Sequence, residues 1–313
     1  MEHAIIISSG RCGSTLLSDL IAAEPGTLSA QEFTGSMPGP REGWTEPLNG
    51  ADYWRAASGP LPELRTLTRL GIEVQERRYP RTGRWGRDIA NLPRILGATL
   101  SKLSPDPDAL FDQLGQAVSN FPMQPMPVHH HRLLDTLAAM LGRRQWVERS
   151  GGSSMHTREL LQAFPSARVI YLTRDWQATA ASMSKHPMYR LRILRNQVQM
   201  RYGFDPCVPP PESAVPADGR RFLPEHLRPE DLPTPEEAVA GSAMMCAFMH
   251  GQAEQAFREL RPERLLRMTY EDLVAEPGRV LTTVGEFLDL PEPDRWAAGC
   301  AEHVRRPRAG APT

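Results

Sequence analysis

The sequence has few of the residues that mark several common classes of protein. Its four cysteines form no C-x-x-C pair, which argues against a disulfide framework and against a structural metal site. The longest apolar run, residues 238–249, is about 12 residues long, well below the ~20 that cross a bilayer. Residues 1–7 lack the basic segment and long apolar core of a signal peptide. We therefore expect a cytoplasmic protein with no membrane span and no metal.

Neither sign of charge dominates, because the net charge is −1 at pH 7. A balanced charge gives no overall attraction for nucleic acid, so we expect no such partner. Lysine occurs only at Lys102 and Lys185 among 36 basic residues, which we interpret as coding bias toward arginine. With 313 residues, a single domain over residues 1–313 is a simpler interpretation than two domains. The sequence indicates no oligomeric state.

Residues 4–23 predict a buried strand, a tight turn and a helix. Residues 5–7 are three consecutive isoleucines, which is typical of a strand in a parallel sheet covered on both faces. Gly10 and Gly13 bracket the turn, and the leucines after it follow helical spacing. Free N–H groups at such a helix start, with hydroxyl side chains beside them, form a cradle for a phosphate.

The turn lacks the lysine of nucleoside-triphosphate loops. In the motif G-x-x-x-x-G-K-[ST] a lysine follows the second glycine, whereas here Gly13 is followed by Ser14 and Thr15. The β- and γ-phosphates of ATP or GTP would lose their main cationic partner, which argues against an NTPase. The cation of this turn is Arg11, inside the loop, where it can reach a group bonded to a single 5′-phosphate.

Three segments in this order resemble sulfotransferases that use 3′-phosphoadenosine 5′-phosphosulfate (PAPS). The first has the pattern [small]-x-x-R-[SC]-G-[ST]-[ST]-L and resembles the family's 5′-phosphosulfate loop. Residues 168–185 resemble its second strand and helix, and residues 267–290 its tyrosine-bearing strand and closing helix. The resemblance is nearest to the bacterial and protein-tyrosine branch. It implies an α/β fold with a P-loop-type parallel sheet flanked by helices.

The resemblance also implies which residues contact PAPS and its product, 3′,5′-adenosine bisphosphate. Arg174 and Ser182 would hold the 3′-phosphate, and Tyr270 would contact the nucleotide. Arg305 and Arg306 lie in a basic C-terminal segment that would close over the nucleotide, the alternative being a frayed terminus. The residues implied at the 5′ end are Arg11, Cys12, Gly13, Ser14 and Thr15.

Two catalytic residues follow from the same resemblance. Glu32, at the exit of an expected strand over residues 27–33, reads on its own as a solvated carboxylate, but the family places a catalytic base here. Arg11 would neutralise charge on the bridging oxygen as the S–O bond breaks. Arg149, in a segment similar to the family's W-V-E-K-[ST]-P, is expected either near the sulfuryl group or in a structural ion pair.

Two regions are expected to form the acceptor side. Residues 35–127 match no motif and predict helices and loops around an acceptor pocket. Residues 187–235 predict a helix and then a proline-rich insertion or lid, with disorder as the alternative. Six arginines between positions 77 and 94 are expected to form a solvated face, the alternative being that some of them contact an anionic acceptor or a product phosphate. They are Arg77, Arg78, Arg81, Arg84, Arg87 and Arg94.

The sequence therefore predicts transfer of a sulfuryl group from PAPS to a hydroxyl of a small acceptor such as a natural product, lipid or sugar. The alternatives are a P-loop kinase of a small substrate and a catalytically silent nucleotide-binding module. Cys12 is expected to be a small loop residue, or else a thiol activated by the helix start. Three histidines at residues 129–131 point in different directions on a helix, so they cannot all bind one metal.

Overall fold

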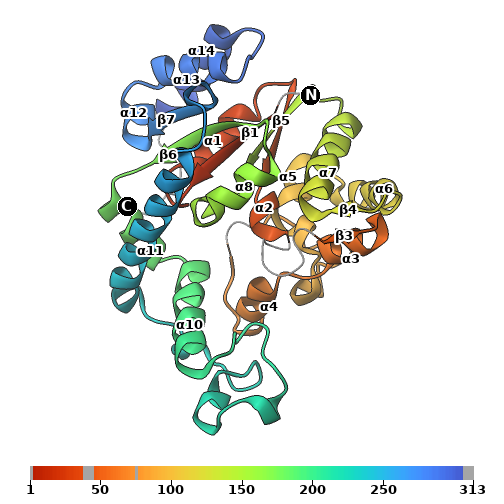
Figure 1. The fold of residues 1–313 in the computed structure, drawn as a ribbon, viewed down its shortest axis with the longest axis vertical. Helices are drawn as coiled ribbons and strands as arrows, with labels where there is room; N and C mark the ends of the chain where they lie inside the picture. Colours follow the sequence, from red (N-terminus) through yellow and green to blue (C-terminus); the bar gives the residue numbers. More distant parts are fainter. Residues whose placement is uncertain (1–2, 38–45, 75–76, 306–313) are drawn as a thin grey trace.

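A computed structural model describes residues 3–37, 46–74 and 77–305 of the chain. Its centre is a five-stranded parallel sheet with the strand order β2-β5-β1-β6-β7 (Figure 1). The strands are β1 (His3–Ser8), β2 (Thr27–Gln31), β5 (Gln145–Arg149), β6 (Arg168–Thr173) and β7 (Leu265–Thr269). All carboxyl ends lie at one edge, where open α/β sheets bind ligands. The predicted α/β fold class is confirmed.

The central strand β1 sends its apolar side chains to both faces of the sheet. Ile5 pairs with Val169 of β6, and Ile6 pairs with Arg149 of β5. Ile5 and Ile7 pack into one hydrophobic cluster and Ile6 into another, and all three are fully buried. A strand covered on both faces has no solvent side, which is why its apolar run is continuous.

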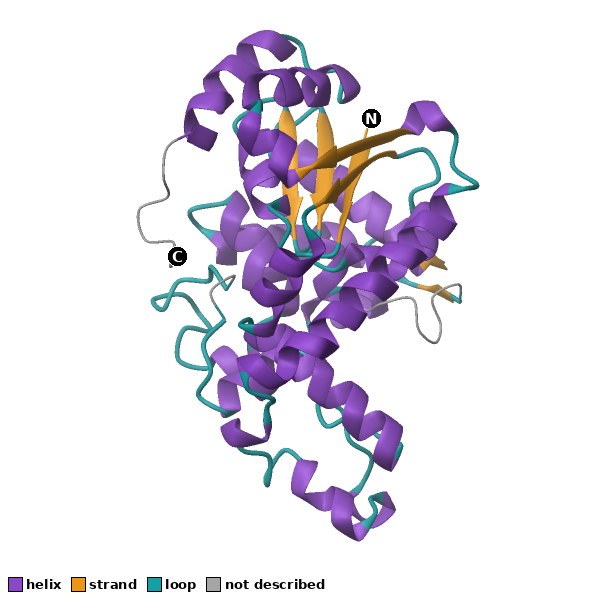
Figure 2. Ribbon diagram, turned by 90° about the vertical axis from the view of Figure 1, so that its left-hand side faces the viewer, coloured by secondary structure: helices purple, strands orange, loops and turns teal. Residues whose placement is uncertain are grey.

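Helices cover both faces of the sheet (Figure 2). The face that carries Ile6 packs against α1 (Ser14–Ile21), α12 (Tyr270–Ala275), α13 (Pro277–Phe287) and α14 (Pro293–Arg305). The opposite face packs against α7 (Met126–Met140), α8 (Thr157–Ala163) and the end of α11 (Pro235–Phe257). Short 3-10 turns lie at Ser153–His156 and Pro262–Arg264. No helix in the described ranges is both long and apolar enough to span a membrane.

The chain between β2 and β5 forms helices and loops. Besides α7, its helices in the described residues are α2 (Phe33–Ser36), α3 (Gly50–Ser58), α4 (Pro62–Arg69), α5 (Ser101–Leu103) and α6 (Pro107–Ser119). A 3-10 turn lies at Ile89–Asn91, and a π-helical turn at Leu96–Leu100 runs directly into α5. An antiparallel pair joins β3 (Pro47–Leu48) to β4 (Gln124–Pro125). This arrangement agrees with the helices and loops predicted for residues 35–127.

The chain after β6 forms α9 (Trp176–Ser184), α10 (Pro187–Tyr202) and a proline-rich segment over residues 206–235. Phe222 and Leu223 of that segment are buried against Leu191 and Leu194 of α10. The structure thus describes this segment as packed against α10, and its role as a lid stays a prediction. In Figure 1 the segment lies at the opposite end of the molecule from α13 and α14. Its 3-10 turns are Glu212–Ala214, Ala217–Phe222 and Pro229–Asp231.

Candidate active site

The turn after β1 brings backbone N–H groups and small residues to the carboxyl edge of the sheet. Gly10 and Gly13 have φ angles of 78° and 87°, which glycine adopts without steric cost. A Cβ on Gly13 would lie 2.2 Å from the ring of Tyr270, so the close approach of this ring also requires glycine. The helix α1 begins at Ser14, and the free N–H groups of its first turn suit a phosphate.

The corner between β6 and α9 lies directly against this turn. Arg174 Nη1 donates to the backbone oxygen of Arg11 at 3.4 Å, and the Arg174 guanidinium carbon lies 4.8 Å from the Tyr270 ring centre. Arg11 Nε donates to Ser182 Oγ of α9 at 3.2 Å. The structure thus brings Arg11, Arg174, Ser182 and Tyr270 together. A nucleotide held from two strand-to-helix corners requires this proximity.

Glu32 lies at the end of β2, next to the same turn. Its backbone N–H donates to the oxygen of Arg149 at 2.7 Å, which continues the pairing of β2 with β5 by one residue. Its carboxylate forms an ion pair with Arg149 and accepts from the N–H of Gly151 at 3.1 Å. The side chain is 24% exposed, so one side of this held carboxylate faces the adjoining cavity.

Arg149 connects the strand ends to the turn. Its side chain is 3% exposed, and its Nη2 donates to Thr15 Oγ1 at 2.7 Å and to Gln31 Oε1 at 3.2 Å. Its Nε has no hydrogen-bond partner among the described residues. Of the two expectations for Arg149, the structure contains the ion pair, with Glu32, and it also places the guanidinium beside the first turn of α1.

Arg11 and Arg149 thus occupy different parts of the site. We expected the Arg11 side chain near the 5′ end of the nucleotide, but its Nε contacts Ser182, which is expected at the 3′ end. The guanidinium beside Thr15 and Glu32 is that of Arg149. Arg11 and Glu32 also share a left-handed backbone, with φ angles of 56° and 55°. Such strained non-glycine residues gather at functional sites.

A second carboxylate lies behind Glu32. Glu148 is fully buried on β5, and burial raises the pKa of its carboxyl to about 7. Its Oε1 accepts from the hydroxyl of Ser150 and from the N–H and hydroxyl of Thr34. Its Oε2 has no hydrogen-bond partner in the described chain. Glu148 therefore supports the residues around Glu32 and has no contact with the cavity.

The helix α10 forms one wall of a cavity of about 200 Å³ that opens beside Glu32. Tyr189 donates its hydroxyl hydrogen to the oxygen of Ser9 at 3.0 Å, and burial raises the pKa of this hydroxyl. A Cβ on Gly10 would lie 2.0 Å from the same hydroxyl oxygen. The helix therefore contacts the turn directly, through a tyrosine that the sequence analysis did not single out.

The remaining turn residues point into the protein or serve the helix start. Cys12 is fully buried, and its Sγ donates to the oxygen of Leu172 at 3.5 Å. Burial fits a small loop residue and contradicts a thiol open to oxidants. Ser14 and Thr15 both line the cavity; Ser14 is only 3% exposed, and Thr15 accepts a hydrogen bond from Arg149.

The arginines between positions 77 and 94 do not act as one group. Arg81 and Arg84 form exposed ion pairs with Glu73 and Asp112. Arg77 and Arg94 line the cavity. The solvated-face interpretation therefore holds for Arg81 and Arg84, and contact with a ligand is open only to the two arginines at the cavity.

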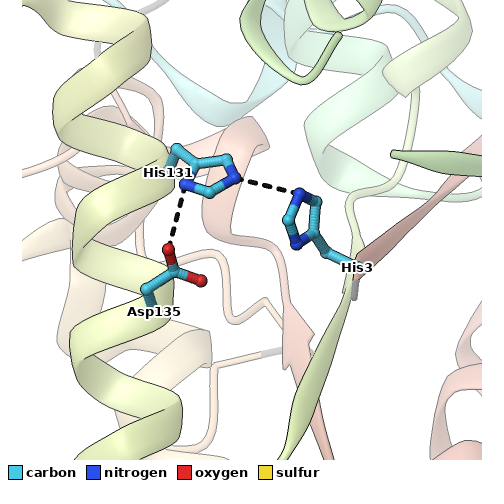
Figure 3. A group of neighbouring side chains, drawn as sticks. All are labelled: His3, His131 and Asp135. Carbon is cyan, nitrogen blue, oxygen red and sulfur yellow. Dashed lines mark hydrogen bonds and ion pairs between the residues drawn. The ribbon is translucent and has the colours of Figure 1, made fainter. Parts of the chain in front are cut away.

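The three consecutive histidines of α7 have separate partners. His129 bonds to the oxygen of Leu48 at 2.8 Å and His130 to the Tyr53 hydroxyl at 2.7 Å. His131 lies 3.0 Å from His3 and 3.1 Å from a carboxylate oxygen of Asp135 (Figure 3). His3 begins β1, so this group lies at the amino end of the strand, opposite the candidate site.

Most of the basic C-terminal segment lies outside the described residues. Arg306 lies outside the described residues, and Arg305 is described only as the last residue of α14. The expected closure of these two residues over a nucleotide therefore stays a prediction.

Sequence reasoning missed Tyr189 and Arg192, which α10 presents to the cavity, and left the position of Arg149 open. One signal for the helix residues was available: they are spaced by three along a helix that follows the Arg174 corner. Nothing local in the sequence indicates that Tyr189 contacts a turn 180 positions earlier.

These features define an α/β fold in which backbone N–H groups and arginine side chains gather at the carboxyl edge of a parallel sheet. Residues 4–206 match the sulfotransferase family and residues 152–303 match a sulfotransferase domain, so the chain belongs to the sulfotransferase family. A search of curated proteins found no match.

Solved structures similar to this chain include two bacterial-type sulfotransferases. The sulfotransferase domain of the curacin biosynthetic pathway is 17% identical, with 93% of this chain and 75% of that chain covered and a TM-score of 0.49. Sulfotransferase STF9 from Mycobacterium avium is 16% identical, with 98% and 69% covered and a TM-score of 0.47.

Proposed function

We propose that the chain transfers a sulfuryl group from PAPS to the hydroxyl of a small-molecule acceptor and releases 3′,5′-adenosine bisphosphate. The observation that carries the proposal is the contact between the two strand-to-helix corners, where Arg174 donates to the backbone of Arg11. A nucleotide with phosphates at both the 5′ and 3′ positions needs two such corners side by side. Membership of the sulfotransferase family supports the same assignment.

The residues at this edge suit a doubly phosphorylated adenosine. Gly13 lets the Tyr270 ring pack against the start of α1, where N–H groups would hold the 5′-phosphate together with Ser14 and Thr15. Arg174, Ser182 and Arg11 would hold the 3′-phosphate, and the Tyr270 ring beside Arg174 would contact the nucleotide. Cations and N–H groups supply the charge compensation that two phosphates require.

PAPS supplies the sulfuryl group, whose bond to the 5′-phosphate oxygen breaks as the acceptor oxygen bonds to sulfur. Glu32 accepts the proton that leaves the acceptor hydroxyl, since its carboxylate faces the cavity. Arg149 holds that carboxylate through the ion pair and places positive charge beside Thr15. The role expected for Arg11 at the leaving oxygen stays a prediction, because its Nε contacts Ser182 at the other corner. Such preorganised groups act mainly by electrostatics.

The nucleotide part of this proposal is tested by thermal shift of the full chain. We expect 3′,5′-adenosine bisphosphate to stabilise the protein more than AMP or ATP at equal concentration. The difference should shrink in the Arg174→Ala variant. Equal stabilisation by AMP would overturn the assignment of the second corner to the 3′-phosphate.

The transfer part is tested with labelled PAPS and a broad panel of hydroxyl compounds. Appearance of a labelled sulfate ester that depends on Glu32 supports the proposed enzyme. Binding of the bisphosphate without turnover on the panel would favour a silent nucleotide-binding module. Transfer from ATP with Mg²⁺ would favour a kinase, although Ser14 stands where a kinase loop has lysine.

A further inference from the structure

A group of three titratable side chains lies at the amino end of β1, away from the candidate active site (Figure 3). His3 begins the strand, and His131 and Asp135 lie one turn apart on α7. Each residue offers one possible ligand atom, and these atoms lie within 4.8 Å of one another. In the described part of the chain, it is the one group of histidine, cysteine and carboxylate side chains close enough together to hold a metal ion.

The two imidazole rings of this group face each other through their Nε2 atoms. The Nε2 atoms of His3 and His131 are 3.0 Å apart, and the planes of the two rings are nearly perpendicular, at 86°. Two nitrogens at this distance need a positive centre between them, because two lone pairs would repel each other. That centre is either a hydrogen carried by one of the nitrogens or a metal ion bound to both.

The carboxylate of Asp135 orients His131 as a metal ligand. Its Oδ2 lies 3.1 Å from His131 Nδ1, and a carboxylate can only accept, so the hydrogen of this contact belongs to Nδ1. The neutral form of His131 then carries its lone pair on Nε2, on the side of His3. Histidines that bind metals commonly donate their other ring N–H to a carboxylate, which fixes the tautomer and raises the basicity of the ligand.

Trp146 of β5 holds both neighbours of His131 in place. Its indole Nε1 donates to Asp135 Oδ1 at 2.9 Å, so each carboxylate oxygen has a partner. Its ring stacks on that of His3, with 4.7 Å between the ring centres and 11° between the planes. His3 and Trp146 are also partners in the pairing of β1 with β5, and Trp146 is fully buried. The group is therefore built on two strands and a helix, which keep its geometry rigid.

The separation of the two nitrogens is close to that of neighbouring ligands on zinc. Zn²⁺ binds imidazole nitrogen at about 2.0–2.1 Å, so two such ligands of a tetrahedral ion lie about 3.3 Å apart. Entry of the ion requires the two rings to separate by a few tenths of an ångström and to turn toward it. The side chains of His131 and Asp135 are 30% and 35% exposed, so water reaches the group. The exposed Ser166 hydroxyl lies 3.1 Å from His3 Nε2.

We propose that His3 and His131 bind a zinc ion through their Nε2 atoms, that Asp135 positions His131, and that water or the Ser166 hydroxyl supplies the remaining ligands. The ion joins the first strand of the sheet to α7, so it stabilises the fold and takes no part in the proposed sulfuryl transfer. This proposal departs from the sequence-based expectation of no metal. That expectation considered cysteine motifs and adjacent histidines, whereas these two ligands lie 128 positions apart.

The test measures zinc binding by the full, untagged chain at about pH 7.5, where ordinary imidazoles are mostly neutral and free to bind metal. Equilibrium dialysis counts the ions bound per chain. Urea unfolding with and without zinc measures stabilisation, because an ion that binds the folded chain more tightly raises the free energy of unfolding. We expect one zinc ion per chain and an unfolding midpoint that rises with zinc concentration. The visible spectrum of Co²⁺ bound in its place distinguishes nitrogen and oxygen ligands from thiolates.

Substitutions locate the ion. His3→Gln and His131→Gln should each abolish the stabilisation by zinc. In Asp135→Asn the amide oxygen can still accept from Trp146, but the amide N–H₂ donates to His131 Nδ1 and so moves the ring hydrogen to Nε2. Zinc affinity should therefore fall at least tenfold, as it does when such outer partners are lost. His226→Gln, which removes an exposed histidine of the proline-rich segment, is the matched control and should keep the affinity.

The outcomes separate a zinc site from a pair of histidines bridged by hydrogen. No zinc bound by the original chain, or zinc binding that survives both histidine substitutions, would overturn the proposal. Thiolate bands in the Co²⁺ spectrum would place the ion at a cysteine and would overturn it as well. If the histidine variants fail to fold, Asp135→Asn decides, and an unchanged zinc affinity in that variant contradicts the site. None of these measurements uses PAPS or an acceptor, so their result is independent of the proposed function.

Discussion

The residues assigned to the nucleotide come mainly from the ends of strands, whereas most residues at the cavity beside Glu32 come from helices and loops inserted between strands. The nucleotide side is the turn at residues 8–15, the corner at residues 174–182 and Tyr270. The side proposed for the acceptor is formed by α4, the chain around Arg77 and α10. Strand pairing fixes the first set, because neighbouring parallel strands place their carboxyl ends together. Helix packing fixes the second, so it can change without disturbing the sheet.

Arg149 belongs to both sides. It contacts Thr15 on the nucleotide side and Glu32 beside the acceptor cavity. The difference between the two sides therefore suggests a division of labour, in which the sheet specifies the donor and the inserted helices specify the acceptor. Substitutions on each side should affect one ligand and spare the other.

The largest expected effect is that of Glu32→Gln. Loss of the proposed base should lower kcat about a hundredfold or more, because general bases contribute 10²–10⁴-fold. Affinity for 3′,5′-adenosine bisphosphate should stay the same, since the nucleotide side is intact. Single-turnover kinetics and calorimetry measure the two quantities. The control is Glu73→Gln, which removes an exposed carboxylate paired with Arg81. Normal turnover in Glu32→Gln would exclude Glu32 as the base.

The next effect is on the free energy of unfolding, and it comes from Glu148, the buried carboxyl group behind Glu32. Glu148 keeps its proton up to a pH of about 7 in the folded protein, whereas an ordinary carboxyl releases it near pH 4.5. The unfolded chain therefore binds fewer protons between these values, and the free energy of unfolding should fall as the pH rises from about 4.5 to about 7. Above pH 7 the carboxylate of Glu148 is ionised although it is buried, so it destabilises the folded protein most strongly there.

Glu148→Gln should abolish this fall in the free energy of unfolding as the pH rises. The amide oxygen can accept the bonds from Ser150 and Thr34, and no charge forms on the side chain. At pH 8 we expect the variant to be more stable than the original by about 3 kcal/mol, at 1.36 kcal/mol per pKa unit. At pH 5 the difference should be small. Urea unfolding at both pH values measures it, and an equal difference at pH 5 and pH 8 would contradict the mechanism.

The parts of the site that could be predicted from sequence depend on short-range patterns. The isoleucines of β1, the glycine turn and the start of α1 lie within about 20 residues, and each limits the backbone locally. The resemblance implied that both corners hold one nucleotide, and in the structure the parallel pairing of β1 with β6 brings the two corners together.

The acceptor side could not be predicted in this way. The position of Tyr189 depends on a contact with Ser9, and that of Arg195 on carboxylates from α4 and from the chain after α10. The proline-rich composition of residues 206–235 predicted a lid or disorder. In the structure Phe222 and Leu223 pack against apolar side chains of α10. Such long-range packing leaves no periodic signal in the segment itself.

Arg174→Ala should impair the nucleotide side and spare the acceptor side, which is the reverse of the effect expected for Glu32→Gln. Removing a charge-assisted contact of about 1.5–3 kcal/mol should weaken binding of 3′,5′-adenosine bisphosphate about tenfold or more. Binding of AMP and the KM for the acceptor should change little. Arg158→Ala, an exposed arginine on α8, is the control. If AMP affinity falls as much as bisphosphate affinity, Arg174 does not distinguish the 3′-phosphate.

The smallest expected effect is on stability, and it is tested by substituting one glycine on each side of the site. Gly13 cannot accept a side chain, because of its positive φ and the Tyr270 ring, but Gly97 in the π-helical turn has only Leu64 and Leu92 atoms at 3.8–3.9 Å. Gly97→Ala should therefore stabilise the protein by about 0.4–1 kcal/mol, by restricting the unfolded chain. It should leave bisphosphate binding intact, whereas Gly13→Ala should weaken it. Thermal unfolding with and without bisphosphate measures both. A destabilised Gly97→Ala would mean that the acceptor side is packed as tightly as the nucleotide side, and the proposed freedom of its helices to vary would be lost.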